Sequence, residues 1–105
     1  MPRRRQPVTL YTAPGCGPCK AAHAAIERAG IPARIIDREH ATAAQLAEAG
    51  ARAHAAGQPA QFPILTVRGQ TYTGPAAALK AREIERAQQA RQERRAAKAR
   101  RMVNR

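Results

Sequence analysis

Tryptophan is absent from this 105-residue sequence, and aromatic residues amount to only 3% of it. Much of the 44% hydrophobic fraction is alanine, so few large side chains remain to fill a core. A chain of this length fits one domain with a small core, and we expect modest stability. The large apolar residues expected in that core are Val8, Leu10, Ile26, Ile35, Ile36, Leu46, Phe62, Ile64, Leu65, Val67, Leu79 and Ile84.

Long apolar runs are also missing. No segment is apolar over a length that could span a bilayer, and no apolar stretch follows the basic residues 3–5, as it would in a secretory signal. We therefore expect a cytoplasmic protein without a membrane contact. Cysteine is scarce too: only Cys16 and Cys19 are present. Two cysteines at this spacing in the cytoplasm favour redox or metal chemistry over a structural disulfide framework.

Acidic residues are few: seven stand against nineteen Lys and Arg, for a formal net charge of +12. The excess lies at the ends, because residues 6–79 are nearly neutral whereas residues 80–105 hold ten cations and three glutamates. We expect a basic disordered arm at 1–7, a domain at 8–88 and a basic helical or disordered tail at 89–105. A solvated extension explains such a tail; the alternative is weak, non-specific contact with nucleic acid.

The order of β-prone and helical segments predicts an α/β domain with the pattern β-α-β-α-β-β-α. The first two strands are joined through a helix, so they should be parallel with a right-handed crossover, and the last two should form a hairpin. The result is a four-stranded mixed sheet flanked by helices. The expected strands are Val8–Tyr11, Ala33–Asp37, Ile64–Val67 and Gln70–Thr73. The expected helices are Gly17–Ala29, a second from the Thr42 capping box to about His54, and a basic one that begins after Gly74-Pro75 and continues through at least Ala90.

The central motif is Cys16-Gly17-Pro18-Cys19, which follows a strand and a loop and begins a helix. Cys16 is expected at the N-cap, where the Cys19 N–H and the helix dipole favour a thiolate. Lys20 adds a nearby positive charge, so we expect the pKa of Cys16 to lie below the free value of about 8.5. Cys16 is then the nucleophile toward a substrate disulfide, and Cys19 the more buried resolving thiol.

The chain resembles the glutaredoxin-like redoxins of the thioredoxin fold, and within them it is most similar to the NrdH-type hydrogen donors of ribonucleotide reductase. The likeness covers about residues 8–79. It is carried by five motifs: Val8–Thr12, Cys16–Lys20, Ile36-Asp37, Phe62–Leu65 and Thr73–Pro75.

Proline is tolerated at the first position of a strand, and a cis bond before proline is uncommon, so Pro63 alone predicts nothing special. The resemblance implies that Pro63 is cis and faces the redox pair, with the Phe62 backbone available to pair with an extended substrate segment. It also places Lys20 and Gly74 at the surface that binds the substrate. It further implies a monomeric protein that needs neither a cofactor nor a metal for catalysis.

The likeness to glutathione-dependent members stops after Gly74. Those members usually follow a Gly-Gly pair with an acidic residue that holds glutathione, whereas this chain has Pro75 and Ala76. The expected substrate is a disulfide-containing protein, with ribonucleotide reductase a candidate. Of the two candidate electron donors, thioredoxin reductase is therefore favoured over glutathione.

Three other functions are compatible with parts of the sequence. A zinc site would use Cys16, Cys19 and His23, but three ligands on one helix are too few for a structural site. A binding module would use the redoxin fold and the basic tail to hold nucleic acid or an acidic partner. A redox-sensing regulator resembling the Spx/arsenate-reductase group would need a large helical insertion, which this short chain lacks.

Overall fold

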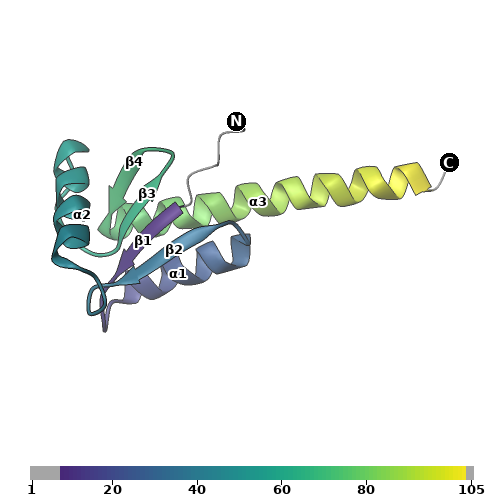
Figure 1. Cartoon of the computed structure of the whole chain (residues 1–105). Coiled ribbons are helices and arrows are strands. Elements are labelled where there is room, and N and C mark those ends of the chain that lie inside the picture. The colour runs from purple at the N-terminus through teal and green to yellow at the C-terminus, as the bar shows by residue number, and fades with distance from the viewer. Residues whose placement is uncertain (1–7, 104–105) are drawn as a thin grey trace, which may run out of the picture.

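The computed structural model describes residues 8–103, shown in Figure 1. The basic arm expected at 1–7 lies outside the described residues, as do positions 104–105 of the expected tail. In chain order the elements are β1 (Val8–Thr12), α1 (Gly17–Ala29), β2 (Ala33–Asp37), α2 (Ala43–Ala55), β3 (Ile64–Val67), β4 (Gln70–Thr73) and α3 (Gly74–Val103).

The four strands form one mixed sheet in the order β2-β1-β3-β4. β1 and β2 are parallel and joined through α1, whereas β3 runs antiparallel to both β1 and β4. The β3–β4 turn consists of Arg68 and Gly69, with φ angles of 51° and 78°. Positive φ at both positions is what a two-residue turn of the I′ type requires. The predicted β-α-β-α-β-β-α fold with a mixed sheet is therefore confirmed.

The sheet is covered on both faces. Leu10 points to one face, where it is fully buried with side chains of α1, β3 and α3. Its neighbour Tyr11 points to the other face and packs with Ala49 of α2 and Ile64 of β3. Because successive side chains of a strand alternate between faces, α1 and α3 cover one side of the sheet and α2 the other.

Alanine forms most of the contact between α1 and α3. Side chains this small let two helix backbones approach closely and leave little room for anything larger. The alanines of these two helices that are buried in the core around Leu10 are Ala22, Ala25, Ala77 and Ala81.

Two residues expected in the core are exposed, so the prediction was wrong for them. Ile35 is 37% exposed because β2 is an edge strand, and within residues 8–103 no strand pairs with its outer side. Leu79 is 62% exposed because it lies two residues from both Ala77 and Ala81, about 200° around the helix from each. Tyr11, which was not expected in the core, is only 5% exposed.

α3 is one continuous helix of 30 residues that begins directly after β4. Its first turns pack on the sheet, and its C-terminal part extends beyond the rest of the protein (Figure 1). Nearly every side chain from Arg91 to Val103 is exposed. Among the helices of residues 8–103, none combines the length and the apolar content that crossing a membrane would need.

Candidate active site

The loop after β1 places Cys16 at the start of α1. Cys16 is the N-cap residue, with extended backbone angles, and the backbone N–H of Cys19 donates to its Sγ at 3.1 Å. Pro18 occupies the first turn, where its missing N–H removes no helical hydrogen bond. The capping geometry predicted from the sequence is therefore confirmed, including Cys19 as the donor.

Cys16 and Cys19 form a disulfide with a Cα–Cα distance of 5.2 Å, well within the range that a disulfide can bridge. The two sulfur-bearing residues differ in burial. Cys19 is 2% exposed and faces the core, whereas Cys16 is partly exposed. The next residue, Lys20, is exposed. Cys16 is therefore the more accessible of the two cysteines.

The Phe62–Pro63 peptide bond is cis, as the family resemblance implies. Tyr11 of β1 pairs with Ile64, so Pro63, the residue before Ile64, lies beside the end of β1 that leads into the loop before Cys16. Pro63 is buried, and its carbonyl accepts a hydrogen bond of 2.9 Å from the Gly74 N–H. This proline and the redox pair therefore lie at the same end of the sheet.

Gly74 connects β4 to α3 in a left-handed conformation, with φ of 57°, and it is buried. A Cβ at this position would collide with the side chain of Gln61. The loop that contains Gln61 is also tied to β4, because Gln58 accepts hydrogen bonds from the N–H and the hydroxyl of Thr73. The structure gives Gly74 a packing role beside the loop that carries Phe62.

The end of β2 and the residue after it are hydrogen-bonded to Thr12, the last residue of β1, just before the loop that leads to Cys16. The Thr12 hydroxyl donates to the Asp37 carboxylate at 3.2 Å, and the Arg38 N–H donates to the Thr12 carbonyl at 2.8 Å. Asp37 also accepts a hydrogen bond from the Glu39 N–H, which makes it a turn-forming residue.

Arg38 was missed by the sequence prediction. Its guanidinium lies 5.9 Å from the centroid of the partly exposed Phe62 ring, which adds a cation to the surface at this end of the sheet. The available signal was its position directly after β2, because the carboxyl ends of parallel strands meet at one edge of a sheet.

His23 follows the two cysteines at the spacing that the zinc alternative requires. Its Nε2 instead lies 3.0 Å from the Glu27 carboxylate, one turn further along α1. Within residues 8–103, no group of three or more His, Cys, Asp or Glu side chains is placed to hold a metal ion.

A comparison with protein families identifies one match: the model of the family described as Glutaredoxin aligns with residues 8–71. The matched segment is more than half of the chain and runs from β1 into β4, so it contains Cys16, Cys19 and Pro63. It ends before α3. A comparison with curated proteins gives no match.

Proposed function

The chain belongs to the glutaredoxin family, and from this premise we propose that it reduces protein disulfides with Cys16 as the nucleophile and Cys19 as the resolving thiol. The observation that carries the proposal is the position of Cys16: it is partly exposed at the N-cap of α1 and accepts a hydrogen bond from Cys19. The partial positive charge at the N-terminus of a helix favours the thiolate form of Cys16, which is the reactive form of the side chain.

The reduced protein begins the reaction. The Cys16 thiolate attacks one sulfur of a substrate disulfide, forming a mixed disulfide and releasing the other sulfur as a thiolate, which takes a proton from water. The Cys19 thiolate then attacks Cys16 Sγ. The Cys16–Cys19 disulfide forms, and the second substrate sulfur leaves. Two electrons pass to the substrate, and the chain ends in the disulfide form that the structure contains.

Burial separates the roles of the two cysteines. Cys19 is almost inaccessible to solvent, so a substrate as large as a protein reaches Cys16 instead. The short Cα–Cα distance of 5.2 Å then allows Cys19 to resolve the mixed disulfide without a large backbone movement.

The substrate surface of this proposal consists of the partly exposed Phe62, the exposed Lys20 and the Arg38 guanidinium beside the Phe62 ring. An extended substrate segment pairs with the backbone next to Pro63, as in other cases of strand addition. The two cations suit a substrate segment with acidic residues beside its disulfide.

We assign thioredoxin reductase as the electron donor, rather than glutathione. The first turn of α3, which begins at Gly74, holds no acidic side chain of the kind that holds glutathione in the glutathione-dependent members. Ribonucleotide reductase is the substrate suggested by the likeness to NrdH-type redoxins.

The test is reduction of insulin disulfides by the full chain with NADPH and thioredoxin reductase, against a parallel assay with glutathione, glutathione reductase and NADPH. We expect activity in the first system, complete loss in Cys16→Ser, and a trapped mixed disulfide with substrate in Cys19→Ser. Full activity of Cys16→Ser would refute the proposed nucleophile. Rapid turnover with glutathione alone would refute the assigned donor. Replacement of insulin by oxidised ribonucleotide reductase tests the suggested substrate.

A further inference from the structure

The end of the protein remote from the redox pair carries a groove of about 870 Å³. It lies between the β3–β4 turn and the middle of α3, beside the first residue of β1. Val8, Ile31 and Val67 are among its apolar lining residues, and Arg68, Lys80 and Arg91 are its cations.

Most of this positive charge is uncompensated. The Lys80 ammonium lies 3.5 Å from Glu83, the one carboxylate that lines the groove, and 5.4 Å from the centroid of the Tyr72 ring. Arg68 and Arg91 are exposed, and no carboxylate of residues 8–103 forms an ion pair with either of them. The groove therefore offers two free guanidinium groups, one on each of its walls.

The positive charge continues along α3 beyond the groove. With about 100° between successive residues, five cations of the distal helix fall within an arc of about 120°, and this arc includes the groove-lining position of Lys80. Glu93, the only acidic residue after Glu85, lies about 140° from the centre of the arc. We call this surface the cationic face; its five distal members are Arg91, Arg94, Arg95, Lys98 and Arg101.

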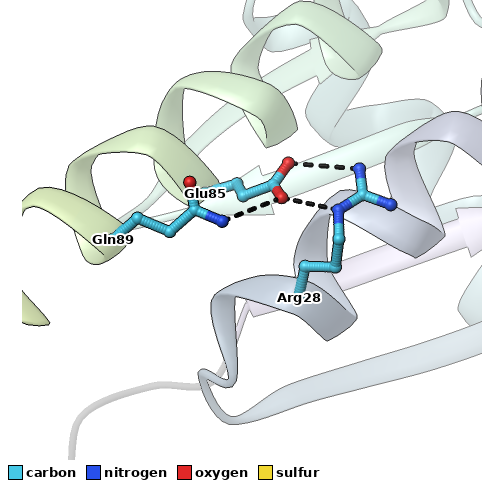
Figure 2. Close-up of polar contacts among 3 residues, drawn as sticks. All are labelled: Arg28, Glu85 and Gln89. Atoms are coloured by element: carbon cyan, nitrogen blue, oxygen red, sulfur yellow. Dashed lines mark hydrogen bonds and ion pairs between the residues drawn. The ribbon is translucent and has the colours of Figure 1, made fainter.

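The direction of α3 is fixed where it leaves the protein. Ala77 and Ala81 are buried against α1 and the sheet, and Glu85 is held by Arg28 of α1, with Gln89 donating to the same carboxylate (Figure 2). The cationic face is therefore carried on a helix that is already oriented, so little ordering is needed when a partner binds.

From these observations we propose that the cationic face and the groove bind double-stranded DNA through its phosphates. The exposed part of α3 is a rod of about 10–12 Å diameter, which matches the roughly 12 Å width of the DNA major groove. An RNA duplex has a deep and narrow major groove that does not admit a helix. The proposed contacts are made by Lys and Arg side chains to phosphates and not to base edges, so binding should not depend on the DNA sequence.

Other polyanions fit this surface less well. Single-stranded nucleic acid is usually held by stacking of successive bases on several aromatic side chains, whereas α3 has none and the groove is lined by one, Tyr72. A helix that binds lipid needs a broad apolar face. Here, the only large apolar residues after Ile84 are Met102 and Val103, at the tip of the helix.

The experiment measures binding of the full chain to a labelled DNA duplex of about 24 base pairs over a range of salt concentrations. Five phosphate contacts predict a slope of about −4.5 in a plot of log K against log salt, or a loss of roughly 500-fold between about 50 and 200 mM salt. A slope close to zero would overturn the proposal.

Two variants with equal charge loss test the assigned face. The first, Arg91→Gln with Arg95→Gln and Lys98→Gln, removes three cations of the cationic face and should reduce the slope by about 3 units. The control, Arg82→Gln with Arg86→Gln and Arg100→Gln, removes three exposed cations outside the face and should change the slope by less than about 1 unit. Equal effects of the two variants would refute the cationic face.

Competitors distinguish the partner. At equal concentrations of negative charge, unlabelled duplex DNA should displace the labelled duplex better than single-stranded DNA does. Duplex RNA, polyglutamate and anionic vesicles should also compete less well than duplex DNA. Equal competition by any of these overturns the assignment to duplex DNA. Insulin reduction should remain unchanged in both triple variants, because the substituted residues lie far from Cys16; a parallel loss would show that the tested surface belongs to the redox site instead.

Discussion

Arg28 in the last turn of α1 and Glu85 in α3 form a two-bond ion pair, although they lie 57 positions apart in the sequence (Figure 2). Glu85 is the more buried partner, with a side chain only 13% exposed, and Gln89 donates a third hydrogen bond to it at 3.3 Å. The hydrogen bond from Arg28 is the main cause that lowers the pKa of Glu85 below its ordinary value of 4.5. The pair joins the two helices at the point where α3 leaves the domain.

A first prediction concerns the pH dependence of this pair. Because the pKa of Glu85 is lowered in the folded state, its contribution to stability is present above pH 4.5 and is lost as the pH falls through the folded-state pKa. Urea unfolding should show that Glu85→Gln is less stable than the wild type at neutral pH, by a small margin since Arg28 is largely exposed. The difference should shrink as the pH is lowered from 4.5 through the folded-state pKa of Glu85. A difference of the same size at neutral pH and in acid would mean that the ionised carboxylate is not the stabilising group.

The positions of the helices and strands could be predicted because local signals coincide with the element ends. Gly30 ends α1 and Thr42 caps α2, and both residues are found in these roles. Exposure at Ile35 and Leu79 could not be predicted in the same way, because it depends on which strand is at the edge and which side of α3 meets the sheet. Sequence spacing alone fixes neither.

The redox pair was predictable from four consecutive residues, since the Cys-x-x-Cys spacing and the helix start are both local. The surroundings were not. Arg38 reaches the Phe62 ring across 24 positions of sequence, and Gln61 packs over Gly74 only because the two flanking loops meet at the end of the sheet. The position of Arg38 directly after β2 indicates the end of the sheet at which it lies, but the contacts themselves depend on the complete fold.

A second prediction concerns the reactivity of the two thiols. In the reduced protein at neutral pH, Cys16 should alkylate roughly tenfold faster than Cys19, because Cys16 is partly exposed while Cys19 is buried, and because the N-terminal end of α1 favours the Cys16 thiolate. Limited treatment with iodoacetamide followed by peptide mass spectrometry measures the two rates. Equal alkylation rates of the two thiols in the native protein would contradict the assigned roles. As a control, the two rates should become equal in urea, where the fold is lost.

A third prediction uses two left-handed glycines as a matched pair. Gly30→Ala introduces a Cβ into open space at φ of 65°, so only the backbone conformation opposes it, at a cost of about 1–2 kcal/mol. Gly74→Ala meets the same conformational cost and a clash with Gln61, so it should be clearly more destabilising in urea unfolding. Adding Gln61→Ala should return Gly74→Ala to the level of Gly30→Ala. If Gln61→Ala does not restore stability to the Gly74→Ala variant, the clash with Gln61 is not the cause of the extra destabilisation.

A fourth prediction concerns the alanine contact between α1 and α3. Ala22 is fully buried in this contact, so Ala22→Leu should overpack it and lower the free energy of unfolding by about 1–3 kcal/mol. The adjacent Ala21 is exposed, and Ala21→Leu should change stability by less than about 0.5 kcal/mol. Thermal or urea unfolding compares the two variants directly. Comparable losses in both would show that helix propensity, rather than packing, sets the effect.

The exposed length of α3 also acts as a spacer. From Glu85, where the helix is last joined to α1, to Val103 it extends about 27 Å, close to the diameter of a small domain. Cys16 lies at the opposite end of α1 from Arg28, so the helix leads away from the reactive sulfur. A folded protein that docks over Cys16 needs about 800 Å² of free surface on this chain. A large group bound near the tip of α3 therefore lies away from that surface and leaves Cys16 accessible to a second protein.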